Sequence, residues 1–330
     1  MDTSLTRALG LEHPIVQAPI GSLSSPRLAS AVSNAGGLGM IAMTWTDADV
    51  VRRQLREMEA LTDRPFGINL ILNWPQEERL AVALDAGARI VSFFWGDPAP
   101  LVPAVHAAGA LAMLTVASAA EAARAVDAGV DIIVAQGWEA GGHVWGEVAT
   151  LALVPVVVDA VPGTPVIAAG GIADGRGLAA VLALGAAGAW MGTRFVASEE
   201  SGAHPDYLAL LSAASETGTI HASLFDVGWP NAPHRTLRNR TVELWQAAGS
   251  PASGSRPGEG EVLAWEADGE PIVRYSSISP RADDSGAVAD LSLWAGQGVG
   301  LVNDVLPAAE IVRRVADDAE TILGRLGTGS

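Results

Sequence analysis

The stretch QGWEAGGHVWG, residues 136–146, places His143 directly after two glycines and close behind the apolar run 132–135. That run is typical of a buried strand, so His143 is expected on the loop that follows it, where small residues let a ligand approach the backbone. An imidazole there can take a proton from an acidic carbon, and we predict that His143 is catalytic. Four other histidines lack such surroundings and are expected to be structural or solvated: His13, His106, His204 and His221.

Glycine-containing turns also follow the last two apolar runs before residue 200. Gly170 and Gly171 end one run, and Gly192 and Thr193 end the next. Backbone N–H groups at such turns can hold a phosphate, as they often do after the seventh and eighth strands of a barrel. Ordinary turn formation also places glycine at strand ends, but two such turns at neighbouring ends favour a phosphate site.

Two amide side chains are expected near other strand ends. Asn69 and Gln136 each donate and accept hydrogen bonds, which suits the edge of a flat ring such as the isoalloxazine of a flavin. Each could instead be a polar residue satisfied near the core. No metal site is expected, because the sequence has no HxxxH pair and no carboxylates at ligand spacing. The absence of cysteine excludes disulfides, iron–sulfur clusters and a cysteine nucleophile.

The elements that position these residues are short apolar runs, each typical of a strand buried on both faces of a parallel sheet. Eight such runs precede residue 213: 15–20, 37–42, 66–72, 89–95, 110–116, 131–137, 165–171 and 188–195. Between them lie segments such as 47–61 and 121–129, whose apolar residues recur at helical spacing. Glycines that suit helix C-termini precede several runs: Gly36, Gly87, Gly109, Gly129 and Gly185. Eight consecutive βα units predict an α/β fold, a (β/α)8 TIM barrel, with an open sheet as the alternative.

Beyond the barrel the composition changes. Residues 215–295 are polar and rich in turn residues, and too long for a simple connection. We therefore expect three parts, a barrel over residues 1–214, a lid or small substrate-binding domain over 215–295, and a segment 296–330 that returns to the barrel. Residues 307–326 within this last segment have the pattern of an amphipathic helix.

The overall composition narrows the partners. A net charge of −17 argues against nucleic acid and against an anionic membrane surface. The first sixteen residues lack the basic start and apolar run of a signal peptide, and no apolar stretch is long enough to span a membrane. The expectation is a cytoplasmic protein with a small-molecule substrate; the sequence leaves the oligomeric state open.

Several motifs together resemble the nitronate monooxygenases, formerly called 2-nitropropane dioxygenases. In order along the chain they are QAPIGSLSSPRLASAVSNAGGLGMI, FGINLIL, QGWEAGGHVWG, PVIAAGGIADGRGLAAVLALGAAGAWMGTRF, LFDVGWPNAPHRTLRN and AGQGVGLVNDVLPAAEIV. The resemblance covers nearly the whole chain. It implies an FMN-dependent barrel enzyme that oxidises alkyl nitronates, and in some cases nitroalkanes, with O2 to a carbonyl compound and nitrite.

The resemblance also assigns roles to residues. His143 falls at the catalytic position, as base toward neutral nitroalkanes and as an anchor for nitronates. The positions implied to bind FMN are Ala18, Asn69, Gln136, Gly141, Gly170, Gly171, Trp190, Met191, Gly192 and Thr193. The candidates for the substrate side are Trp138, Trp145, Gln297 and Gly298.

The sequence departs from the family pattern in places, and a rival remains. Ile20 stands where many relatives carry Met, and Gly298 where Ser is frequent. Trp74 and Trp95, with Trp138 and Trp145, indicate a crowded, aromatic-lined pocket, although tryptophan more often serves packing.

The rival is an FMN-dependent NAD(P)H reductase, of the enoyl-ACP reductase or quinone reductase type, on the same scaffold. A lid with several basic residues would suit its partners, and this one has Arg235, Arg238 and Arg240; their alternative role is a solvated or salt-bridged face. A ligand sensor on an inactive barrel would be expected to lose His143 or the glycine turns, and both are present.

Overall fold

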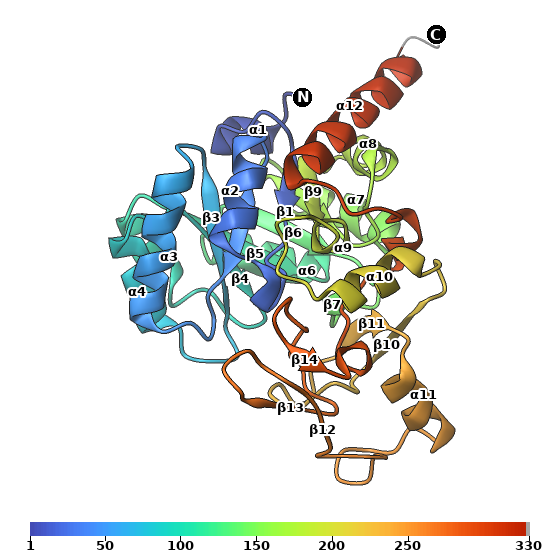
Figure 1. The fold of residues 1–330 in the computed structure, drawn as a ribbon. Coiled ribbons are helices and arrows are strands. Elements are labelled where there is room, and N and C mark those ends of the chain that lie inside the picture. The colour runs from blue at the N-terminus through green and yellow to red at the C-terminus, as the bar shows by residue number, and fades with distance from the viewer. Residues whose placement is uncertain (328–330) are drawn as a thin grey trace.

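Eight parallel strands close into a barrel in the computed structural model, which describes residues 1–327 (Figure 1). The strands are β1 Ile15–Gln17, β2 Gly39–Ala42, β3 Phe66–Ile71, β4 Ile90–Phe94, β5 Leu111–Val116, β6 Ile132–Gln136, β8 Val166–Ala169 and β9 Gly188–Met191. Their order is β1-β9-β8-β6-β5-β4-β3-β2. Leu38 closes the ring by bridging Val16, and its carbonyl accepts a hydrogen bond from the Gln17 N–H at 2.9 Å. The predicted barrel is confirmed, and the open-sheet alternative is wrong.

Helices alternate with the strands, as the sequence predicts. They are α1 Ser4–Leu9, α2 Pro26–Asn34, α3 Ala48–Leu61, α4 Glu77–Asp85, α5 Val102–Ala107, α6 Ala119–Asp127, α7 Thr150–Ala160, α8 Gly175–Ala183, α9 Thr193–Val196 and α10 Pro205–Ala213, with a short 3-10 turn, η1, at Gly21–Leu23. The five glycines expected at helix ends all have positive φ, between 69° and 96°. Only glycine takes this left-handed conformation without a steric cost, so the sequence pattern marks where each helix ends.

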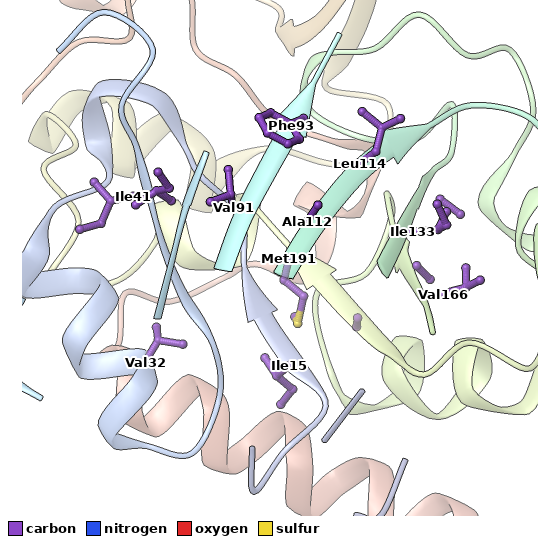
Figure 2. Packing of buried hydrophobic residues seen from close by; sticks show 14 of the residues in the cluster. Ile15, Val32, Ile41, Val91, Phe93, Ala112, Leu114, Ile133, Val166 and Met191 are labelled. Carbon is purple, nitrogen blue, oxygen red and sulfur yellow. The ribbon is translucent and has the colours of Figure 1, made fainter. Parts of the chain in front are cut away.

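The strand residues alternate between two apolar layers. Ile133 and Ala135 of β6 face the helices, whereas Ile132 and Val134 fill the barrel interior, which Leu5 and Leu9 of α1 close at the end away from the small antiparallel sheets (Figure 1). Figure 2 shows the outer layer, with Val91, Phe93, Leu114 and Ile133 pointing from neighbouring strands. Because side chains alternate with a period of two, the last inward residue of each strand reaches the barrel mouth.

Residues between α10 and the C-terminal helix α12, Ala308–Gly327, form two small antiparallel sheets at one end of the barrel, one of them together with a short strand that follows β6 (Figure 1). One, in the order β10-β11-β7, joins β10 Thr219–Ala222 and β11 His234–Leu237 to β7 Gly142–His143. The other, in the order β13-β12-β14, consists of β12 Val262–Trp265, β13 Pro271–Val273 and β14 Ser285–Gly286. Helix α11 Arg240–Ala247 and the 3-10 turns η2 Val288–Asp290 and η3 Gln297–Leu301 complete this part. Sequence analysis identified the segment as polar and turn-rich and did not anticipate its strands.

The chain then returns along the barrel wall. Helix α12, Ala308–Gly327, packs against α8 and α2 at the end of the molecule away from the small sheets (Figure 1). Its residues Ile311, Val312 and Val315 join the outer apolar layer. Within residues 1–327, no helix combines the length and the apolar character needed to cross a membrane.

Candidate active site

A cavity of about 490 Å³ opens at the carboxyl ends of the barrel strands. This is the end at which barrels place their chemistry, and the volume lies in the usual range for small-molecule sites. Asn69, Gln136 and Trp190 reach it as inward residues near the ends of β3, β6 and β9. The predicted site residues that line it are Ala18, Asn69, Gln136, Gly141, His143, Gly170, Gly171, Trp190, Gly192, Thr193 and Gly298.

Two other predicted residues lie away from the cavity wall. Met191 is buried in the outer apolar layer with Ile15 (Figure 2), because it follows the inward-facing Trp190 and so points the opposite way. The side chain of Gln297 is exposed, while its backbone N–H donates to the Glu139 carbonyl at 2.8 Å. Neither side chain is placed to contact a ligand in the cavity.

None of the four tryptophans expected around the pocket, Trp74, Trp95, Trp138 and Trp145, is among the residues that line the cavity. Trp145 lines a neighbouring cavity and donates through Nε1 to Glu121 at 3.3 Å. The Trp138 ring lies against His221, at 4.1 Å between ring centroids, and under the guanidinium of Arg235, at 5.1 Å. Both rings serve packing behind the site.

One side of the cavity is formed by backbone, and we call it the glycine wall: Gly170, Gly171, Gly192, Thr193, Gly296 and Gly298. Gly170 and Gly171 have φ of 107° and 73°, which side chains rarely tolerate. A Cβ on Gly298 would lie 2.9 Å from the Gly171 carbonyl oxygen. The Thr193 hydroxyl accepts from the Gly296 N–H at 3.0 Å. Loops from three parts of the chain therefore pack backbone against backbone here.

The loop before His143 is packed just as closely. A Cβ on Gly141 would lie 2.5 Å from the Gly296 backbone nitrogen, whereas the Cβ direction of Gly142 is open. The Glu139 carboxylate accepts from the Thr150 N–H at 2.8 Å, and the Thr150 hydroxyl lies 3.0 Å from both that carboxylate and the Gly170 carbonyl. Gly141 is thus small because the loop meets the 295–296 backbone, a reason that the sequence does not reveal.

The two amides have different surroundings. Asn69 donates through Nδ2 to the Ser92 carbonyl at 3.2 Å. Gln136 donates through Nε2 to the His143 carbonyl at 3.2 Å, while its Oε1 is buried and has no protein partner among residues 1–327. A buried acceptor without a donor is costly, so Gln136 is suited to receive a hydrogen bond from a bound group.

His143 lies at the junction of the barrel and the first small sheet. Strand β7 pairs with β11, so that His143 lies opposite His234 and Gly142 opposite Arg235. The imidazole stacks on the Trp229 ring at 4.0 Å between centroids, and Trp294 lies at 5.3 Å. Its Nε2 is buried and, among the described residues, has no hydrogen-bond partner. The site therefore presents an imidazole held between aromatic rings, with a buried Nε2 that is free to accept a hydrogen bond or a proton.

Burial controls the charge of this histidine. Burial, together with a smaller contribution from the nearby His234, lowers the pKa of His143 to about 3. His143 is consequently neutral at pH 7 and available to accept a proton. His234 is different, because its Nε2 accepts from the Phe225 N–H at 3.1 Å and its Nδ1 then donates to the Ala232 carbonyl at 2.9 Å. Both of its nitrogens are used, which makes it a structural residue.

The other side of the cavity is formed by large apolar side chains, and we call it the tryptophan wall: Trp45, Phe94, Trp229, Ile278 and Trp294. Trp74 stands behind it, 5.1 Å between centroids from both Trp45 and Trp229. Sequence analysis did not single out Trp45, Trp229 or Trp294. For Trp229 the available signal was its place in the motif LFDVGWPNAPHRTLRN.

The lid arginines do not line the cavity. Arg235 is buried and donates to the Trp138 carbonyl at 2.9 and 3.3 Å, and Arg238 donates to Gln246 at 3.2 Å on the surface. No Asp, Glu, Lys or Arg side chain is among the residues of 1–327 that line the cavity. In the same range no cluster of three or more His, Asp or Glu side chains is arranged to hold a metal ion.

Sequence comparisons connect this arrangement with known proteins. The profile of a family described as nitronate monooxygenase matches residues 2–78 and 73–318. A nitronate monooxygenase of Pseudomonas aeruginosa is 34% identical over 366 positions, covering 96% of this chain and 99% of that protein. A (3aS,4S,5R,7aS)-5-hydroxy-7a-methyl-1-oxo-octahydro-1H-indene-4-carboxyl-CoA dehydrogenase of Mycobacterium tuberculosis is 33% identical over 354 positions, covering 97% of each.

Solved structures are similar to this chain over nearly its whole length. FabK from Thermotoga maritima superimposes with a TM-score of 0.81 at 32% identity, covering 99% of this chain and 98% of that one. A nitroalkane oxidase from Streptomyces ansochromogenes superimposes with a TM-score of 0.80 at 29% identity, covering 98% and 99%. The similarity in each case extends over the barrel and the small sheets together.

Proposed function

Because the chain belongs to the nitronate monooxygenase family, a family of flavoenzymes, we propose that this oxidoreductase binds FMN and oxidises alkyl nitronates with O2 to a carbonyl compound and nitrite. We propose further that it accepts neutral nitroalkanes. The observation that carries the proposal is the free Nε2 of His143, buried in the same cavity as the glycine wall. A neutral, unpartnered imidazole beside a cofactor cradle is suited to proton abstraction.

The cavity fits a flavin nucleotide in two respects. The glycine wall offers backbone N–H groups and the Thr193 hydroxyl to a phosphate, with no side chain in the way. The unpartnered Oε1 of Gln136 calls for a donor, which a flavin ring edge supplies, and Asn69 and Ala18 would complete that side. When bound, the flavin supplies the electron transfer between substrate and oxygen.

His143 has different tasks with the two substrate forms. Toward a neutral nitroalkane its free Nε2 would accept the proton from the carbon that bears the nitro group. Burial disfavours the imidazolium that results, but the nitronate anion formed beside it favours that charge, so the two charges stabilise each other. A substrate supplied as the nitronate has no such proton to lose, and His143 would then orient the anion.

A reductase remains the second candidate, because a relative named as a dehydrogenase is nearly as similar in sequence to this chain as the nitronate monooxygenase is. FabK and the CoA dehydrogenase are 32% and 33% identical to this chain, close to the 34% of the nitronate monooxygenase. Nicotinamide dinucleotides and coenzyme A carry several phosphates, which arginine and lysine usually bind. The absence of such side chains from the described cavity wall favours a small substrate instead.

Rapid mixing distinguishes the two candidates. The purified protein is expected to show a flavin spectrum, and its absorbance should bleach when it is mixed without oxygen with propyl-2-nitronate and not with NADH or NADPH. Admitting oxygen should then yield acetone and nitrite in equal amounts. Bleaching by a nicotinamide, with none by the nitronate, would replace the proposed function by the reductase.

A further inference from the structure

We infer that the cavity selects substrates that carry a flat aromatic ring and no charge other than that of the reacting nitronate. Trp229 acts in this selection as a specificity-determining residue that donates a hydrogen bond to the nitro or nitronate group. The inference rests on the proposed function and specifies its substrate class.

The first support is the geometry of the tryptophan wall. The Trp45 and Trp229 rings are 6.2 Å apart between centroids at an angle of 73°, and the Trp74 ring contacts both edge to face. Edge-to-face contacts of this kind hold rings in fixed orientations. Trp229 is 3% exposed, and Trp45, at the rim, is 57% exposed. Because these rings are held in place, they offer a preformed surface to a flat ring. A short alkyl chain would gain less binding free energy from that surface.

The second support is the distribution of charge. The chain has 20 Arg, no Lys, and 37 Asp and Glu residues, yet none of these side chains is among the described residues that line the cavity. A substituent such as a carboxylate would be taken out of water there without an ion-pair partner, which is strongly unfavourable. The cavity should therefore reject substrates that carry a second charge.

The third support is a pair of free polar atoms. The Nε1 of Trp229 and the Nε2 of His143 are both buried without a hydrogen-bond partner among residues 1–327, and their rings stack at 4.0 Å between centroids. Indole nitrogen can only donate. A nitro or nitronate oxygen accepts such a hydrogen bond, while the neighbouring imidazole takes the proton from carbon. These two nitrogens locate the reacting group at the inner edge of the tryptophan wall.

The test measures binding without turnover, on the flavin-loaded protein, by calorimetry. Three unreactive carboxylates replace three nitronates, because both groups present two oxygens in a plane. They are phenylacetate for an aromatic substrate, butyrate for an aliphatic one, and succinate for a substrate with a second charge. Phenylacetate should bind at least about tenfold more tightly than butyrate, from ring burial and aromatic contacts. Succinate should bind more weakly than butyrate.

Two variants and one control assign these differences to residues. Trp45→Ala removes an exposed ring, so the fold should persist, and it should reduce the preference for phenylacetate about 3- to 10-fold without changing butyrate binding. Trp229→Phe keeps a ring but loses the donor, and should weaken phenylacetate and butyrate by a similar factor of about 10. Trp265→Ala, on β12 and 48% exposed outside the cavity, should change neither.

Three results would overturn the inference: succinate binding as tightly as butyrate, phenylacetate binding no better than butyrate, or Trp45→Ala weakening both monocarboxylates equally. The same measurements distinguish a failure of this inference from a failure of the proposed function. If propyl-2-nitronate does not react while the order of the three carboxylates holds, the selectivity stands and the nitronate chemistry is wrong. If nitronates react and the order does not hold, the inference about substrate class is wrong.

Discussion

The two sides of the cavity are built in opposite ways. The glycine wall is backbone from loops that follow β8 and β9, together with residues 296–298, and at Gly170, Gly296 and Gly298 a Cβ would collide. The tryptophan wall is side chain, contributed by a loop after β2, the end of β4 and the segment that carries the small sheets. The shape of a wall made of backbone cannot be altered by substitution without moving the chain, whereas the shape of a wall made of side chains can. Under the proposed function, the cofactor side of the cavity is therefore the constrained part, and the substrate side the adjustable part.

The largest loss of activity is expected from a substitution of His143, which lies where the two walls meet. Changing it to Gln keeps a polar side chain but removes the base, and should lower kcat/KM for nitroethane by about 100- to 10,000-fold. Ethyl nitronate needs no proton removed, so its kcat/KM should fall by about tenfold or less. Steady-state oxygen consumption with both substrates measures the difference. Equal losses for the two would mean that His143 positions the substrate and does not act as a base.

The second prediction tests how tightly the His143 loop is packed against the glycine wall at Gly296, by comparing two adjacent glycines of that loop. Gly141→Ala places a Cβ 2.5 Å from one backbone atom and 2.6 Å from another, and should cost about 1–3 kcal/mol of unfolding free energy and weaken FMN binding. Gly142→Ala meets no atom within 4 Å, and its φ of 71° should cost about 1 kcal/mol.

Urea unfolding and FMN titration of both variants measure these effects. FMN affinity should fall in the Gly141 variant and stay near the wild-type value in the Gly142 variant. The reverse order would show that backbone conformation in the loop, and not contact with residues 295–296, requires the glycines.

The third prediction concerns the support of the His143 loop. Arg235→Lys keeps a charge but loses the planar fork that bonds the Trp138 carbonyl and lies over its ring, so stability should fall by about 1–2 kcal/mol. Arg238→Lys, on the surface beside Gln246, is the matched control and should change stability by less than about 0.5 kcal/mol. If both variants unfold alike, the contact between Arg235 and Trp138 does not hold the loop.

Much of the barrel, and the glycine wall with it, could be predicted from the sequence for a local reason. Continuous apolar runs mark strands buried on both faces, and the residue at each run's end lies at the barrel mouth whatever the rest of the chain does. This placed Gln136 and the turns of Gly170 and Gly192 correctly on the cavity, and Asn69, within the run 66–72, lines it as well. It did not separate Trp190 from Met191, since alternation within a strand, and not motif membership, decides which side chain points inward.

The tryptophan wall could not be predicted in this way, because its position depends on non-local pairing. Trp229 reaches His143 only because β11 pairs with β7 across about ninety residues of chain. The segment that contains β11 has no alternating pattern strong enough to reveal its short strands. A side chain placed by the packing of one loop on another leaves no periodic trace in the sequence.

The smallest effect follows from burial under the tryptophan wall, and it appears as a pH dependence of stability. Burial lowers the pKa of His143 to about 3 and that of His234 to about 4, below the value of about 6.5 expected in the unfolded chain. A lowered pKa means that folding favours the neutral form, so the stabilisation is complete above pH 6.5 and is lost as the pH falls toward the folded values. When the pH falls from 7 to 6, each of these two histidines should lower the unfolding free energy by about 0.7 kcal/mol. His143→Gln removes one of the two contributions. The urea midpoint of this variant should therefore change less between pH 7 and pH 6 than that of the wild type. An equal change would mean that the tryptophan wall leaves His143 accessible to water and protons.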